Sequence, residues 1–318
     1  MMKRMAKKNR KSGFARARVS AKQKSVEILK RIVRYASENK IAVFLKYLYE
    51  GFILAEYRLL SLKWFLQGGR LPDKKEQEAV IKNVTFIYKS FERQGMAKRL
   101  AKNIQRYYPG VKIIIADDSQ IPLKIKTPHV EVLNLPFNSG LSYGLNRALE
   151  KVTTPYTIRI DDDMLLTPFT RFHEQLLFLK QHEEIDLSAV QACSAPFLKK
   201  SEDRAKEYFP FSMSNAPKQL LIKHMTPVDD NHIVSGKTPN VFIIKTESFR
   251  AIGYDDNIRM IDHNDFFMRA AGNIVSAMDL KAFVFHYHNR FDRHYEKYRS
   301  DWKRDWVYIQ SRNKKGDS

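Results

Sequence analysis

The chain has 318 residues, of which 43% are hydrophobic, so it can bury at least one large core and is not a disordered tail. Its formal net charge of +21 predicts anionic partners. The single cysteine, Cys193, excludes an internal disulfide framework and a cysteine-based zinc site, and it favours a reducing compartment.

Basic residues are concentrated at the N-terminus. The first forty residues contain fourteen Lys or Arg against Glu27 and Glu38. No apolar run of seven or more residues follows directly, and no small-residue cleavage site is present, so the pattern is not that of a signal peptide. We expect this segment to remain on the protein and to bind an anionic partner.

The next segment, residues 40–69, predicts an amphipathic helix. Charged residues interrupt it, so no run of 18 or more apolar residues remains and a transmembrane helix is not favoured. Gly68, Gly69 and Pro72 end the helical pattern. Apolar residues recur at three- and four-residue spacing on one stripe: Phe44, Leu48, Phe52, Ala55, Leu59, Leu62 and Leu66.

Two interpretations of this amphipathic helix remain open, and both can hold at once. It docks on the catalytic domain, or residues 1–72 lie on an anionic membrane surface. Nucleic acid is a third possible anion, but no motif that reads it is present, so it is not favoured. We therefore expect residues 1–78 to form a basic, amphipathic helical extension.

From about residue 79 the pattern predicts an α/β fold with a parallel sheet. Short β-rich runs alternate with helical segments whose lengths suit right-handed crossovers. Ligands of such sheets bind at the carboxyl ends of the strands. Strands are expected at 84–90, 111–118, 129–135 and 156–160, and helices at 95–108 and 141–152.

Two aspartate clusters close predicted strands. Asp117 and Asp118 follow KIIIA, and Asp161, Asp162 and Asp163 follow YTIRI. Because parallel strands end at one edge of a sheet, we expect both clusters to converge on one site. An aspartate after a strand can also cap a helix or form a turn, but that needs one carboxylate rather than three.

Adjacent carboxylates need a compensating charge. Two unit charges about 4 Å apart interact by about 4 kcal/mol at an effective dielectric of about 20, and a divalent ion would offset that repulsion. Mg²⁺ and Mn²⁺ prefer carboxylate oxygens and characteristically bridge them to substrate phosphates. The aspartates therefore predict a divalent metal, Mn²⁺ or Mg²⁺, and a phosphorylated ligand.

Taken in order, these motifs resemble the nucleotide-sugar half of GT-A glycosyltransferases of the family 2 group, most closely the β1,4-N-acetylgalactosaminyltransferases. Those enzymes carry Lys-x-Phe-x-Arg after the first strand, Asp-Asp after the second, a Pro-Phe segment before Gly-x-Asn, and Val-Thr-Thr before Asp-Asp-Asp. The matching residues here are Lys89, Phe91, Arg93, Asp117, Asp118, Pro136, Phe137, Asn146, Val152, Thr153, Thr154, Asp161, Asp162 and Asp163.

The resemblance implies a GT-A catalytic domain over residues 79–318, with a Rossmann-like, mostly parallel central sheet flanked by helices. It implies inverting transfer of a sugar, GalNAc favoured over GlcNAc and Gal, from a UDP-sugar to a hydroxyl of a glycan or lipid-linked oligosaccharide. The nucleotide-sugar-binding residues it implies are Lys89, Phe91, Arg93, Asp117, Asp118, Asn146, Asp161 and Asp162. The metal ligands it implies are Asp161, Asp163 and His286.

The C-terminal half resembles the acceptor side of the same enzymes, in which a His-x-Glu-Phe-Phe block holds the catalytic carboxylate. Here the block runs from His263 to Phe267, and Asp265 replaces the glutamate. Asp265 is therefore the expected general base, with Asp262 as the alternative; an aspartate on a helix surface is the plain structural interpretation. His286 and His288 alternate along an extended run and share one face, so either could ligate metal or simply form hydrogen bonds.

The expected setting is a cytoplasmic enzyme, peripheral at the inner membrane face. We expect residues 194–238 to line the acceptor cleft as loops. Two other functions remain open: a catalytically idle nucleotide- or carbohydrate-binding module with this fold, and a metal-dependent phosphohydrolase.

Overall fold

The computed structural model describes residues 40–196, 220–287, 292–299 and 302–316. Contacts divide the chain into a smaller unit, Met1–Phe52 with Asn289–Arg293, and a larger unit, Ile53–His288 with His294–Ser318. In the smaller unit, Lys46 pairs with Asp292 at 2.8 Å. The assignment of catalysis to residues 79–318 stays a prediction.

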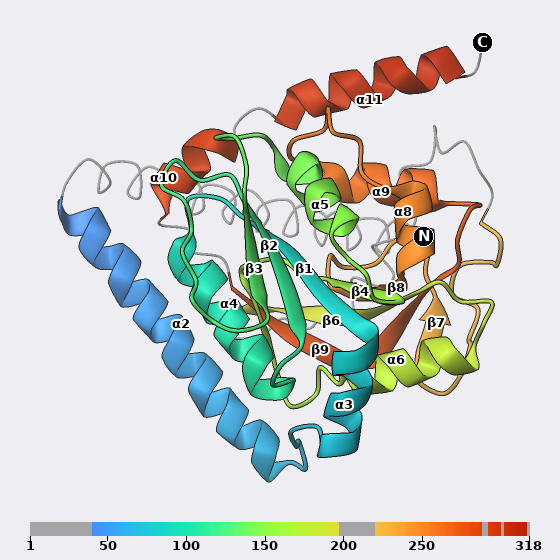
Figure 1. Ribbon diagram of the computed structural model, residues 1–318, viewed down its shortest axis with the longest axis horizontal. Helices are drawn as coiled ribbons and strands as arrows, with labels where there is room; N and C mark the ends of the chain where they lie inside the picture. Colours follow the sequence, from blue (N-terminus) through green and yellow to red (C-terminus); the bar gives the residue numbers. More distant parts are fainter. Residues whose placement is uncertain (1–39, 197–219, 288–291, 300–301, 317–318) are drawn as a thin grey trace, which may run out of the picture. The chain divides into compact units, whose positions relative to one another are not determined.

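Within the described residues of the larger unit, nine strands form one sheet (Figure 1). The path through the sheet is β3-β2-β1-β4-β8-β6-β9-β5, and β7 pairs with β9. The strands are β1 (Val84–Ser90), β2 (Lys112–Asp117), β3 (Val130–Asn134), β4 (Tyr156–Arg159), β5 (Met164–Leu166), β6 (Leu187–Ala195), β7 (His232–Val234), β8 (Phe242–Lys245) and β9 (Ser276–Tyr287).

The sheet has a parallel half and a mixed half. β3, β2, β1 and β4 run parallel, as predicted, whereas β8 is antiparallel to both β4 and β6. β5 and β7 are each antiparallel to β9, and β6 is parallel to it. The predicted α/β class with flanking helices is confirmed, but the sheet is mixed rather than mostly parallel. The prediction missed the mixed half because all the strands that it identified, between residues 84 and 160, belong to the parallel half.

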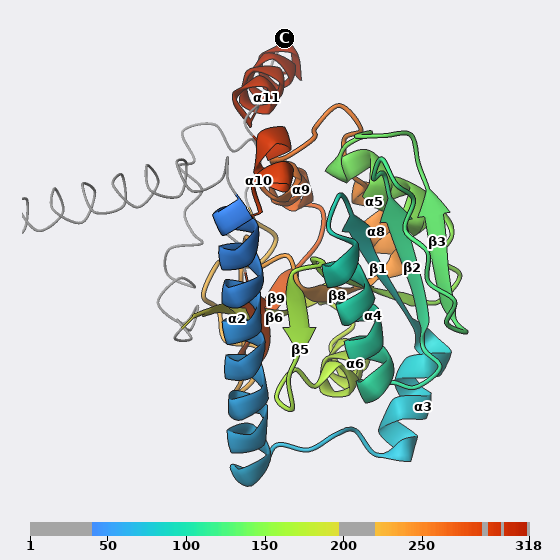
Figure 2. The same cartoon turned by 90° about the vertical axis from the view of Figure 1, so that its left-hand side faces the viewer.

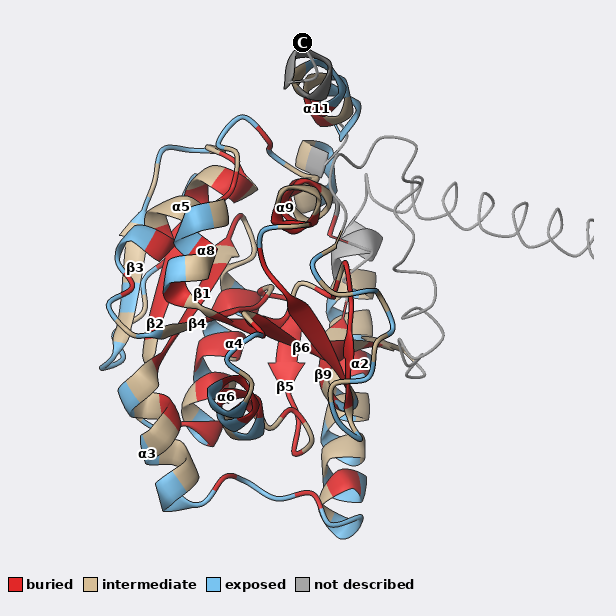
Figure 3. Cartoon of the chain, turned by 90° about the vertical axis from the view of Figure 1, so that its right-hand side faces the viewer, coloured by how far each residue is buried: buried red, intermediate tan, exposed pale blue. Residues whose placement is uncertain are grey.

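Helices cover both faces of the sheet because alternate strand residues point to opposite sides. Phe86 and Tyr88 of β1 pack in a core with α3 (Lys74–Asn83), α4 (Gln94–Tyr107) and α6 (Phe172–Gln181). Ile87, between them, packs in a second core with α5 (Leu141–Glu150), α8 (Thr246–Ile252) and α9 (Asp262–Ala270). Figure 3 shows the central strands of the sheet as buried, whereas the edge strand β3 is partly exposed.

The predicted N-terminal helix is α2 (Lys40–Leu66), and its end follows the predicted signal. Gly68 has a φ of +88°, a left-handed conformation that glycine adopts readily, and the Gly69 amide donates to the carbonyl of Trp64 at 2.8 Å. Among the described residues, no helix is long and apolar enough to cross a membrane.

The part of α2 that belongs to the larger unit docks by residues outside the predicted stripe. Ile53 and Trp64 are buried, and the Trp64 ring meets Phe283 of β9 edge-on at 5.3 Å between ring centroids. The Tyr57 hydroxyl donates to the carbonyl of Leu166 at 2.7 Å. The predicted docking is therefore present, but it uses the opposite side of the helix from the predicted apolar stripe.

We predict that Trp64→Ala lowers the free energy of unfolding of the larger unit by about 3–5 kcal/mol, because it empties a buried aromatic site. Leu62→Ala, on the exposed stripe of the same helix, should change it by about 0.5 kcal/mol or less. Urea unfolding of both variants measures the difference, and equal losses would contradict the assignment of the docked face.

Candidate functional site

The carboxyl ends of β1, β2 and β4 meet at one edge of the sheet. Ser90 pairs in register with Asp117, and Ile87 pairs with Arg159. The turn of Asp161–Asp163 follows β4 and borders a cleft of about 600 Å³. The cleft is lined by Lys89, Phe91, Arg93, Asn138, Gly140, Leu141, Asp161, Asp162, Asp163, Lys237, Asn240, Arg259, Met260, Ile261, Asp262, His263, Asn264, His286, Tyr295, Lys297, Tyr298, Arg304 and Asp305.

Arg93, which lies between β1 and α4, holds two of the three aspartates of the turn. Its guanidinium pairs with Asp162 and donates to Oδ2 of Asp163 at 3.2 Å. Burial raises the pKa of Asp162 to about 7; Arg93 opposes this rise, and the charge of Asp163 adds to it. The sequence analysis expected Arg93 to bind the nucleotide-sugar, which stays a prediction; its pairing with Asp162 and Asp163 was not foreseen.

His286 lies beside Asp163 because β5 and β9 pair antiparallel, with Met164 opposite His286. Its Nε2 atom is 3.5 Å from Oδ1 of Asp163. Burial lowers the pKa of His286, but the charge of Asp163, the hydrogen bond to it and the charge of Asp161 together outweigh that effect, so the pKa lies above its ordinary value. The predicted neighbourhood of Asp163 and His286 is therefore present. His288 lies outside the described residues.

Two carboxylates, Asp161 and Asp163, and the imidazole of His286 are ligand types that a divalent cation accepts. Asp161 is the more exposed of the carboxylates, with 30% of its side chain accessible. The buried Oδ2 atom of Asp162 has no hydrogen-bond partner among the described residues. No group of three His, Cys, Asp or Glu side chains in the described chain is already arranged as a metal site.

A fully buried arginine, Arg159, connects this turn to a fourth carboxylate. It donates to Asp161 at 2.6 Å and to the carbonyl of Asn240 at 2.8 Å, and its Nη2 atom lies 3.5 Å from Oδ2 of Asp262. Asp262 begins α9 and lines the cleft. Burial raises its pKa to about 6, with Arg159 acting in the opposite direction. The sequence signal for Arg159 was a charged residue within the apolar run YTIRI.

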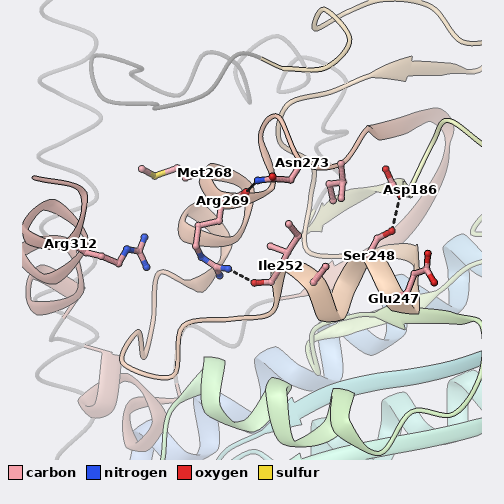
Figure 4. A pocket seen from close by; sticks show the side chains of 10 residues that line it. Asp186, Glu247, Ser248, Ile252, Met268, Arg269, Asn273 and Arg312 are labelled. Atoms are coloured by element: carbon pink, nitrogen blue, oxygen red, sulfur yellow. Dashed lines mark hydrogen bonds between the residues drawn. The ribbon is translucent and has the colours of Figure 1, made fainter. Parts of the chain in front are cut away.

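Asp265, the predicted base, does not line this cleft. It is buried, and its two carboxylate oxygens accept from Arg269, at 2.8 Å, and from Arg312 of α11 (Trp302–Gly316). Both arginines line a second hollow of about 740 Å³ beside α8 and α9 (Figure 4). Of the two carboxylates considered for the base, the structure brings only Asp262 to the aspartate turn.

Asp117 and Asp118 also do not line the cleft. Asp117 accepts from the Ser119 hydroxyl at 2.7 Å and from the Leu123 amide at 2.8 Å, so it shapes the loop after β2. Asp118 is buried against Lys89, and its Oδ2 atom accepts from the Gly140 amide at 3.1 Å. It therefore acts on the cleft by positioning Lys89.

The predicted Gly-x-Asn motif has structural roles. A Cβ atom on Gly144 would lie 3.0 Å from the Lys89 side chain, so this glycine leaves room for the lysine. Asn146 is outside the cleft: it donates to the carbonyl of Tyr254 at 2.8 Å and to Asp256 at 2.6 Å. The structure thus does not bring Asn146 to the expected nucleotide-sugar site.

The C-terminal part of the chain supplies cleft residues that the sequence interpretation missed. Tyr295 of α10 (Arg293–Glu296) lies 3.9 Å from the Arg93 guanidinium, ring centroid to Cζ. Tyr298 of η1 (Lys297–Arg299) meets the Phe91 ring edge-on at 5.0 Å. The alternation of aromatic and basic residues in RHYEKYR was the available signal.

Asp305 of α11 fixes the loop that leads into α9. Its Oδ2 atom accepts from three consecutive backbone amides, at 2.7 Å from Met260, 3.1 Å from Arg259 and 3.3 Å from Ile261. Because Asp262 follows these residues directly, the C-terminal helix helps to set the position of the cleft carboxylate.

The comparison with known proteins matches the part of the chain that contains the aspartate turn. Residues 84–253, just over half of the chain, match the sequence model of Glycosyl transferase family 2. The chain is 32% identical over 194 residues to rat beta-1,4 N-acetylgalactosaminyltransferase 1 and 29% identical over 208 residues to mouse beta-1,4 N-acetylgalactosaminyltransferase 2. These matches cover 60% and 65% of this chain, but only 36% and 39% of the relatives' own length.

Solved structures show partial similarity. The structure of S. aureus TarS 1-349 in complex with UDP-GlcNAc matches 65% of this chain and 58% of its own, with 14% identity and a TM-score of 0.47. That of GalNAc-T7 with UDP, GalNAc and Mn²⁺ matches 69% and 47%, with 11% identity and a TM-score of 0.47. It is the family match over β1 to α8, the segment that carries the aspartate turn, that identifies the chain as a member of glycosyl transferase family 2.

Proposed function

We propose that this protein transfers a sugar, GalNAc favoured, from a UDP-sugar to a hydroxyl of a glycan or glycolipid acceptor, with inversion and with a divalent metal. One observation carries the proposal: a single cleft is bordered by both the Asp161–Asp163 turn and Asp262. The family membership supports the reaction class, and the names of the matched relatives support GalNAc.

The donor end of the cleft combines basic and aromatic side chains. Lys89 and Arg93 carry positive charge beside the aspartate turn, and Phe91, Tyr295 and Tyr298 border the same space. Arginine and lysine suit the diphosphate, and aromatic rings suit a flat base. When bound, a divalent cation held by Asp161, Asp163 and His286 would supply positive charge for the departing diphosphate.

In this proposal Asp262, which lines the cleft, is the general base. As the acceptor hydroxyl oxygen forms its bond to the anomeric carbon, Asp262 takes the hydroxyl proton, the bond from that carbon to the diphosphate breaks, and its electron pair leaves with UDP. A carboxylate with a pKa of about 6 is mostly ionised at neutral pH and still basic enough to accept the proton.

We also propose a setting for the acceptor: a glycan or lipid-linked oligosaccharide at an anionic membrane surface, reached by a cytoplasmic enzyme that binds the inner face through residues 1–72. The basic excess of the first forty residues and the amphipathic helix support this setting. Residues 1–39, and residues 197–219 of the predicted acceptor loops, lie outside the described residues.

The first prediction of this proposal concerns the donor and the metal. Wild-type protein should release UDP slowly from UDP-GalNAc with Mn²⁺ or Mg²⁺ but not with EDTA, and Asp163→Asn should abolish metal-dependent UDP binding, because it removes a charged ligand. UDP release and calorimetric UDP binding are the measurements. Asp230→Asn, an exposed loop aspartate, is the matched control and should leave both unchanged.

The alternatives give different results in the same assay. A catalytically idle module would bind UDP without releasing it from any UDP-sugar. A phosphohydrolase would turn over at full rate without an acceptor, whereas a transferase leaks only slowly to water. Either pattern would contradict the proposed reaction.

The second prediction separates the two candidate bases. Asp262→Asn should lower turnover per folded molecule by about 10²–10⁴-fold while UDP binding is kept, because it removes the proton acceptor and little volume. It should also lower the free energy of unfolding by about 1–3 kcal/mol, because buried Arg159 loses a charged partner. Asp265→Asn should lower the free energy of unfolding by about 1–3 kcal/mol, because Arg269 and Arg312 lose charged partners, but with turnover largely kept. Turnover per folded molecule and urea unfolding, measured on both variants, decide between them; the reverse result would restore Asp265 as the base.

A further inference from the structure

The part of α2 that belongs to the larger unit has two apolar sides, and among the described residues of that unit one side is packed and the other is exposed. The inner side contributes Ile53, Tyr57 and Trp64 to the docking described above. Figure 2 shows this part of α2 beside β5 and β9, the strands with which the inner side is in contact. The other side carries large apolar residues that are exposed. Docking on the larger unit alone would need only the inner side.

Exposed leucines gather on the part of α2 that belongs to the larger unit. We name three of them the apolar ridge, and each is between 60% and 81% exposed: Leu59, Leu62 and Leu66. Their spacings of three and four residues keep them on one side of the helix, over about 10 Å at 1.5 Å per residue. In the smaller unit, Phe44 and Leu48 are also exposed. Single exposed apolar residues are ordinary on protein surfaces, but a contiguous line of this kind marks a surface that another apolar phase covers.

The exposed charges next to the apolar ridge on α2 are basic. Arg58 and Lys63 are exposed, whereas Glu56 is half-buried. In the sequence before α2, residues 1–39 contain thirteen Lys or Arg and two Glu, an excess of eleven positive charges. Basic side chains beside an apolar stripe can keep their charges at the level of lipid headgroups while their stems extend along the apolar surface.

We propose that the apolar ridge lies in the headgroup boundary of an anionic membrane, while the opposite side of the same helix segment stays packed on the larger unit. An interfacial helix of this type buries its apolar face about 5–10 Å deep and gains affinity from basic residues near anionic lipid. The apolar ridge thus gives the proposed membrane setting a specific surface, and binding of lipid does not require the transferase reaction. A protein partner is the other occupant that this surface could take, and the test includes it.

The test uses the full chain in flotation with phosphatidylcholine vesicles, with and without phosphatidylserine. Leu59→Gln with Leu62→Gln should weaken the partition onto anionic vesicles by about tenfold or more, because two ridge side chains lose their apolar contact. The matched control is Ile121→Gln with Leu177→Gln, two exposed apolar residues outside α2, and it should float like wild type. Arg58→Glu with Lys63→Glu should also weaken the partition, whereas Lys124→Glu with Lys126→Glu, in the loop between β2 and β3, should weaken it less.

Measuring metal-dependent UDP binding by each variant separates a loss of lipid binding from a loss of the proposed donor site. Ridge variants that bind UDP normally but no longer float support the membrane surface even if no transfer is found. Equal flotation of ridge and control variants, or no flotation of wild type on anionic vesicles, overturns it. If wild type instead self-associates in gel filtration and the ridge variant is monomeric, with no flotation of either, the ridge is a contact between protein copies and the lipid proposal is wrong.

Discussion

The buried guanidinium of Arg159 is the constraint on which the cleft depends. A charge removed from water must be paired and hydrogen-bonded, and Arg159 meets this condition with Asp161, Asp262 and a backbone carbonyl. Asp161 begins the turn after β4, and Asp262 begins α9, so one side chain ties together carboxylates that are 101 positions apart in the chain. This link sets the distance between Asp161, a proposed metal ligand, and Asp262, the proposed base.

Basic side chains of the protein itself offset the repulsion among the three adjacent aspartates. Arg159 holds Asp161, Arg93 holds Asp162 and Asp163, and His286 stands beside Asp163. The cleft therefore combines adjacent carboxylates with nearby basic residues, the charge pattern that a cation and a diphosphate need together. The same chain that is strongly basic as a whole therefore keeps a local acidic site.

Topology explains why this site lies where it does. β4 is the last strand of the parallel half, and β8 beside it runs the other way, so the cleft forms at the carboxyl end of β4, where the strand pattern changes. The C-terminal helices then complete it: Tyr295 covers Arg93, and Asp305 holds the loop before Asp262. Residues far apart in the sequence thus line one cleft, and the exposed leucines of α2 form a separate apolar surface.

The sequence by itself determined the parallel strands, the crossover helices, the end of α2 and the aspartate turn, because these depend on local periodicity, glycine signals and the rule that ligands bind at strand ends. It also predicted His286 near Asp163. Only the tertiary structure decided that Asp262 rather than Asp265 reaches the cleft, that Asn146 and Asp117 hold loops, and that the apolar stripe of α2 faces outward. Those outcomes depend on which arginines and amides meet each side chain across distant segments, and the spacing of residues along the chain does not specify such pairings.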